Sequence, residues 1–116
     1  MSQEQWRELT REERSVILRI LEKEFRGRDA LREQVALARV RTVDEMGSIE
    51  IDVPGDVGSD AFPGVVPVYA RVPDADGFEI EIQLFVRDGK LSELLMSKED
   101  GSAILQFPVG SGLRIS

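Results

Sequence analysis

Residues 78–98 constrain the fold most strongly, because apolar and polar side chains alternate there on both sides of an Asp88-Gly89 dipeptide. Such alternation predicts β-strands, and Asp-Gly between two alternating runs predicts the turn of a β-hairpin. A hairpin with one apolar face is stable only when other elements bury that face. The remaining segments of the chain can therefore be placed against it.

Two registers are open to this hairpin, and they place different side chains on the apolar face. A two-residue turn at Asp88-Gly89 sets Leu84 opposite Glu93, which puts a carboxylate into an apolar row. A three-residue loop with Gly89 in the left-handed conformation and a bulge avoids this. Burying an unpaired carboxylate costs several kcal/mol, whereas the choice between turn types costs about one. We therefore predict the bulged register.

The bulged register assigns each strand residue to a face. The core face contains the pairs Val86–Lys90, Leu84–Ser92, Ile82–Leu94 and Ile80–Met96. The opposite face contains Glu79, Glu81, Gln83, Phe85, Leu91, Glu93 and Leu95. An apolar patch among carboxylates marks a contact site, and the candidate interaction surface is Phe85, Leu91, Leu95, Glu79, Glu81 and Glu93. The competing interpretation is that residues 105–115 fold across this face and bury it.

Two helices are predicted before the sheet. Thr10-Arg11-Glu12-Glu13 fits a capping box, in which each end residue accepts a hydrogen bond from the backbone amide of the other. The apolar residues that follow form one helical stripe: Val16, Ile17, Ile20, Leu21 and Phe25. Trp6 and Leu9 are expected to fold back onto this stripe. Asp29 is the expected cap of a second, shorter helix that ends at about Ala36.

From Leu37 onward the apolar period changes to two, which predicts strands at 38–42, 49–53, 65–72, 103–107 and 113–115 besides the hairpin. In the third of these segments, Val66, Val68, Ala70 and Val72 share one side, and Pro67 favours an edge strand. Residues 54–63 lack periodicity and are predicted to be a loop.

The sequence thus predicts a single α+β domain over residues 1–116. Two N-terminal helices, at about 10–36, pack on one face of an antiparallel sheet of about five to six strands at about 37–116.

Composition excludes several classes of chemistry. The chain has no cysteine and no histidine, so disulfides, thiol nucleophiles and imidazole-based catalysis or metal binding fall away. Residues 1–43 carry ten Lys or Arg and eight Asp or Glu, whereas residues 44–116 carry five and fourteen. An acidic sheet half repels phosphate, so we expect neither nucleic acid nor an anionic membrane as a partner, and a basic protein is favoured. Net negative charge also serves simply to keep a small domain soluble.

The chain opens with a polar segment, and no apolar run approaches the length of about 18 residues that a membrane span needs. We expect a soluble, cytoplasmic protein without a signal peptide.

Three segments occur in a fixed order: Glu-Phe-Arg-Gly-Arg-Asp-Ala-Leu at 24–31, Gly-Ser-Ile-Glu-Ile at 47–51 and Val-Arg-Asp-Gly-Lys-Leu-Ser-Glu-Leu at 86–94. In this order they resemble a family of short uncharacterised bacterial, largely actinobacterial, proteins with two N-terminal helices and the Asp-Gly-Lys-Leu-Ser-Glu-Leu hairpin. The resemblance covers nearly the whole chain. It implies no activity and therefore no catalytic residue.

Candidate reactive groups are few. Asp74-x-Asp76-Gly77 is similar to the start of a calcium loop, but Phe85 occupies the position of the last carboxylate ligand. Paired carboxylates for glycoside hydrolysis could come from Glu50, Asp52, Glu79, Glu81 and Glu93. One Trp and one Tyr offer few platforms for a sugar, and no histidine is present to activate a serine. We predict no catalytic residue, no cofactor and no metal site.

Three functions remain open. The first is a protein-interaction module, of immunity type or regulatory, that binds another protein through the surface around Phe85. The second is a small-ligand binder or a carboxylate-dependent enzyme with a pocket between the helices and the sheet. The third is a structural homodimer in which this face meets its own copy. We carry the first forward as the prediction.

Overall fold

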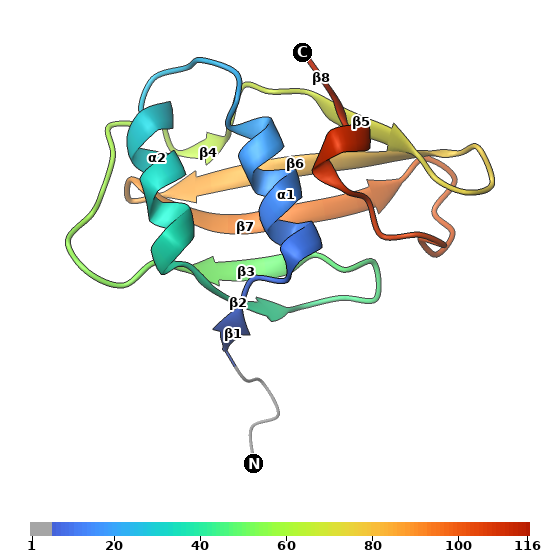
Figure 1. Ribbon diagram of the computed structural model, residues 1–116, viewed down its shortest axis with the longest axis horizontal. Helices are drawn as coiled ribbons and strands as arrows, with labels where there is room; N and C mark the ends of the chain where they lie inside the picture. The colour runs from blue at the N-terminus through green and yellow to red at the C-terminus, as the bar shows by residue number, and fades with distance from the viewer. Residues whose placement is uncertain (1–5) are drawn as a thin grey trace.

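The computed structural model describes residues 6–116, and the polar segment 1–5 lies outside the described residues. Two α-helices and one antiparallel sheet form an α+β fold (Figure 1). Helix α1 spans Arg11–Ile20, and α2 spans Arg28–Gln34 and continues as the 3₁₀ turn η1 at Val35–Leu37. In Figure 1 both helices lie in front of the sheet. The α+β class is therefore confirmed.

The sheet has eight strands, more than the five to six expected. They are β1 Arg7–Glu8, β2 Arg39–Thr42, β3 Ile49–Asp52, β4 Gly64–Val65, β5 Ala70–Pro73, β6 Glu79–Arg87, β7 Lys90–Lys98 and β8 Arg114–Ile115. Their spatial order is β1-β2-β3-β7-β6-β5-β8, and β4 also pairs with β6. All pairs are antiparallel. The predicted strand at 103–107 does not form.

The capping box at the start of α1 is confirmed. The Thr10 hydroxyl accepts a hydrogen bond from the Glu13 amide at 3.0 Å, and the Glu13 carboxylate accepts one from the Thr10 amide at 2.9 Å. The Arg7 guanidinium donates to both Glu13 oxygens at 2.9 Å. Because Arg7 belongs to β1, the same carboxylate that caps the helix also ties it to the edge of the sheet.

The start of α2 differs from the prediction. Gly27, not Asp29, is the N-cap residue, and it has a φ of 86°. A Cβ on Gly27 would lie 2.5 Å from the Ala61 backbone nitrogen. Glycine is therefore required by its positive φ and by the close approach of the loop, neither of which a cap preference reveals.

The buried side chain of Gln34 connects α2 to the hairpin turn and to the long loop. Its amide nitrogen donates to the carbonyls of Val57 at 2.7 Å and Gly89 at 3.0 Å, and its oxygen accepts from the Leu91 amide at 2.9 Å. Two of the three bonds are to the tip of the hairpin, and the third is to the loop that follows β3. Gln34 therefore fixes that tip against the helix layer.

The hairpin forms as expected, but its predicted register is wrong. Asp88 and Gly89 have φ values of 54° and 77°, and Arg87 pairs with Lys90. Positive φ at both central residues is the conformation of a two-residue type I′ turn. Only the positive φ of Gly89 agrees with the bulged three-residue loop.

A bulge lies further along β7, where no irregularity was expected. Val86 pairs with Leu91 and Phe85 pairs with Glu93, so that Ser92 is the extra residue. Beyond it Leu84 faces Leu94, which keeps the carboxylate of Glu93 out of the apolar row. The pairs predicted for the core face, Ile82–Leu94 among them, are therefore replaced, and Ile82 faces Met96.

The C-terminal segment returns over the helices. The 3₁₀ turn η2 at Gly110–Gly112 lies beside α1 (Figure 1). The Gly110 amide donates to the Ser15 hydroxyl at 2.9 Å, and Arg19 Nε donates to the Leu113 carbonyl at 3.1 Å. Leu113 is buried in the core that α1 covers. The interpretation in which residues 105–115 cover the other face of the sheet is thus wrong.

Removal of the helix cap tests this part of the fold. We expect Thr10→Ala to lower the free energy of unfolding by about 1 kcal/mol, because the Glu13 amide loses its acceptor. The melting temperature should fall by about 4 °C. Thr10→Ser keeps the hydroxyl and serves as the control in calorimetry. Equal melting temperatures for Thr10→Ala and the wild type would show that the cap contributes nothing.

Candidate functional site

The outer face, defined as the side of the sheet turned away from α1 and α2, carries the side chains that alternate with buried residues in β6 and β7. Five residues of the predicted surface lie there: Glu79, Glu81, Phe85, Glu93 and Leu95. The sixth, Leu91, does not: it pairs with Val86 and is only 1% exposed. The bulge at Ser92 turns Leu91 into the core, so the prediction that Leu91 shares a face with Phe85 is wrong.

No second layer of the chain covers the outer face among the described residues. The molecule measures 22 Å along its shortest axis. Packed layers are spaced about 10 Å apart, so this thickness accommodates the sheet and the helices but not a third layer. Phe85 and Leu95 therefore remain partly exposed.

Phe85 lies in a hollow of about 530 Å³ on the outer face. Its lining includes Val43, Glu50, Pro63, Phe85, Ser92 and Glu93. Aliphatic and aromatic side chains thus meet two carboxylates in one concave surface. We call this the Phe85 hollow.

A row of side chains crosses the sheet through this hollow. Glu50 pairs with Glu93 on the neighbouring strand, and Glu93 pairs with Phe85 on the next. Arg41 Nε donates to Glu50 at 2.6 Å, and the Trp6 ring lies over the Arg41 guanidinium at 4.7 Å. Glu93 has no ion pair with any of residues 6–116. Glu50 and Glu93 are thus directly opposed carboxylates, and like charges opposite one another on neighbouring strands are destabilising unless a further cation is present.

The other carboxylates of the predicted surface are paired with arginines. Arg114 donates to both oxygens of Glu79, at 2.5 and 2.6 Å, and Arg71 lies 4.0 Å from Glu81. Arg114 comes from the edge strand β8, and Arg71 comes from β5 beside it. The acidic rim expected from the sequence is thus largely neutralised, and Glu93 is the carboxylate that remains available.

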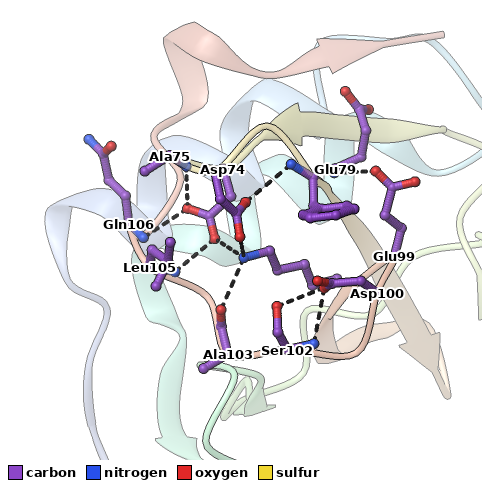
Figure 2. A network of polar contacts seen from close by, with 12 residues as sticks. Asp74, Ala75, Glu79, Glu99, Asp100, Ser102, Ala103, Leu105 and Gln106 are labelled. Atoms are coloured by element: carbon purple, nitrogen blue, oxygen red, sulfur yellow. Dashed lines mark hydrogen bonds and ion pairs between the residues drawn. The ribbon is translucent and has the colours of Figure 1, made fainter.

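A second polar cluster lies at the opposite end of β6 and β7 (Figure 2). Lys98 Nζ is 2.9 Å from Asp74 Oδ2, and neither side chain has exposed surface. The same ammonium donates to Asp76 at 2.7 Å and to the Ala103 carbonyl at 3.1 Å. All three ammonium hydrogens therefore have acceptors.

The Asp74 carboxylate is equally saturated. It accepts hydrogen bonds from the amides of Ala75 at 2.7 Å, Leu105 at 2.7 Å and Gln106 at 3.0 Å. Figure 2 shows it facing this backbone. The amides of Leu105 and Gln106 thus donate to a side chain rather than to a neighbouring strand, which explains why the strand predicted at 103–107 is absent.

Both charges of the pair are stabilised. Burial by itself would raise the pKa of Asp74, but four donors outweigh it and hold this pKa well below its usual value: the Leu105 amide, the Lys98 ammonium and the amides of Ala75 and Gln106. Burial lowers the pKa of Lys98, whereas the hydrogen bonds to Asp76 and Asp74 raise it above its usual value. The pair remains ionised around neutral pH.

This cluster connects parts of the fold and offers no site for a substrate, because Asp74 and Lys98 have no exposed surface and their charged groups already have partners. It also explains why Asp74-x-Asp76-Gly77 is similar to the start of a calcium loop, since the Lys98 ammonium, rather than a metal ion, bridges the two carboxylates. Within residues 6–116, no group of three His, Cys, Asp or Glu side chains is placed to hold a metal ion. In the same part of the chain, no helix has the length and apolar character of a membrane span.

The two members of the buried pair should differ in their effect on stability. We expect Asp74→Asn to lower the free energy of unfolding more than Lys98→Met does. The NH2 group of an asparagine is itself a donor, so it would leave one of the three backbone amides without an acceptor. When Lys98 is lost, Asp74 still accepts from all three amides. Urea denaturation of both variants at pH 7 measures the difference. The reverse order would show that the amide contacts contribute less than the ion pair.

Acidification should reveal the lowered pKa of Asp74. A carboxylate whose folded pKa is below its unfolded value of about 3.9 stabilises the fold fully above that pH and progressively less below it. We expect the difference in unfolding free energy between the wild type and Asp74→Asn to narrow as the pH falls from about 6 to 3. Urea denaturation measures this difference in unfolding free energy. If it stays constant between these pH values, the pKa of Asp74 is not lowered in the folded protein.

Comparison with protein families gives a match over most of the chain. Residues 6–108 match the family model described as "Domain of unknown function (DUF6984)", which covers most of the chain. The chain belongs to this family. No curated protein and no solved structure matches it.

Proposed function

We propose that this member of the family is a protein-interaction domain that binds one partner protein through the outer face of its sheet. The supporting observation is that Phe85 and Leu95 lie partly exposed on a face that neither the helices nor the C-terminal segment covers. An apolar surface of this kind, bordered by polar side chains, is typical of a contact site. The immunity-type or regulatory role, the bacterial origin and the cytoplasmic location stay predictions.

The partner we propose presents a lysine or arginine beside an apolar side chain. Glu93 lies next to Phe85 on the neighbouring strand and opposite Glu50, whose carboxylate Arg41 already holds. A cation entering the Phe85 hollow would meet the free carboxylate, and its aliphatic stem would lie on the ring. Charge complementarity at this point favours a basic segment of a protein over a neutral apolar one.

An enzyme that uses these carboxylates is less well supported. Arg114 and Arg41 bind Glu79 and Glu50, and Arg71 lies 4.0 Å from Glu81. Two of the acids that the sequence offered for catalysis thus form close ion pairs with arginine, and a third has an arginine nearby. A homodimer through the same face is tested directly by the experiment below.

Affinity capture with matched variants tests the proposal. Wild type, Phe85→Ser, Glu93→Lys and Leu105→Ser are used as bait in lysate of the source cells; Leu105 is 63% exposed but lies outside the Phe85 hollow. We expect one protein to be retained by wild type and by Leu105→Ser and lost from the other two. Affinity for that protein should fall at least about tenfold with Phe85→Ser, as for a central aromatic contact.

A photoreactive residue at position 95 then identifies the contact, and the cross-linked peptide should contain a lysine or arginine. Melting temperatures of all variants show that the fold is intact. Equal capture by wild type and Phe85→Ser would contradict the proposal. Light scattering that shows a dimer in the wild type and a monomer in Phe85→Ser would contradict it in favour of a second copy as the occupant.

A further inference from the structure

A proline interrupts the strand that borders the centre of the sheet. Val66, Val68 and Ala70 all point into the core, as the sequence predicts, but β4 ends at Val65 and β5 begins at Ala70. Pro67 has no N–H for the ladder, and the Val68 amide donates to the Val66 carbonyl at 2.8 Å instead of to β6. The backbone therefore kinks away from β6 at this point.

The kink leaves a hollow of about 370 Å³ between the interrupted strand and β6. We call it the Pro67 notch. Its apolar lining is formed by Val65, Val66, Pro67, Val68, Ala70 and Ile82. Its polar lining is formed by Lys23, Tyr69, Glu81, Gln83 and Ser116. The volume is at the lower end of the range of about 300–1,000 Å³ found for ligand pockets.

The polar groups of the notch differ from those elsewhere on the surface. Within residues 6–116, the side chains of Lys23, Tyr69 and Gln83 make no hydrogen bond and no ion pair. Glu81, by contrast, has Arg71 as a neighbour. The notch therefore combines an aliphatic floor with an unpaired ammonium, a free hydroxyl and a free amide, which are all able to donate hydrogen bonds.

We propose that the Pro67 notch binds a small molecule with an apolar body and an anionic head, of the medium-chain carboxylate class. The aliphatic floor takes the chain, and Lys23 and Tyr69 take the carboxylate. Chain burial supplies the affinity, and the ammonium supplies the preference for an anion. The notch and the Phe85 hollow share no lining residue, so this inference does not depend on the protein-interaction proposal.

Octanoate is the probe, and the full chain labelled with ¹⁵N is titrated with it in amide NMR spectra. We expect shifts confined to residues 65–70 and 81–83, to Lys23 after the end of α1 and to Ser116. Hexanoate should bind more weakly, by up to about fourfold for each methylene removed. Octanol, which has the chain without the charge, should bind more weakly than octanoate.

Lys23→Gln should lower octanoate affinity by about threefold to fivefold, the effect of one exposed ion pair, and leave octanol affinity unchanged. Arg14→Gln is the matched control, because it removes an exposed cation of α1 that does not line the notch. Absence of saturable shifts up to about 10 mM octanoate would overturn the site, because even weak specific binding should saturate there. Shifts spread over the outer face would also overturn it. Equal affinity of wild type and Lys23→Gln for octanoate would overturn the assignment of the anionic head.

Discussion

The bulge at Ser92 is the constraint on which the arrangement of the sheet depends. Side chains alternate between the faces of a strand, so one extra residue reverses the facing of everything that follows it. Because Ser92 is inserted, Leu91 faces the core on one side of the bulge, and Leu94, Met96 and Lys98 face it on the other. Without it, Lys98 would point to the outer face and could not reach Asp74. The apolar core and the buried ion pair thus require the same irregularity.

The capping box could be predicted from the sequence, because it requires only Thr10 and Glu13. Asp88-Gly89 likewise predicted the place of the hairpin turn, although not its type. The bulge was missed because strict alternation was assumed along β7 beyond the turn. The signal was present, since Leu91 and Leu94 are three residues apart and cannot share a face of a regular strand. To place the bulge beyond the turn and not at it, the apolar positions of β6 must be matched with those of β7 on both sides of Ser92.

The charge of the outer face could not be predicted for a different reason. Glu79 and Glu81 are acidic in the sequence, but Arg114 and Arg71 neutralise them from strands whose positions depend on the order of the whole sheet. Likewise, Asp74 and Lys98 are far apart in the sequence and meet only because β6 and β7 have the observed register. The net negative charge of residues 44–116 is therefore a poor guide to the charge of the outer face.

The sheet ends in a strand of two residues on each side, β1 and β8. Such short edges give another chain few free backbone groups with which to extend the sheet. Under the proposed function, recognition through the outer face relies on side chains such as Phe85, Glu93 and Leu95, none of which belongs to the hydrophobic core. The binding preference of such a face can change during evolution, one substitution at a time, while the core and the register of the sheet stay the same.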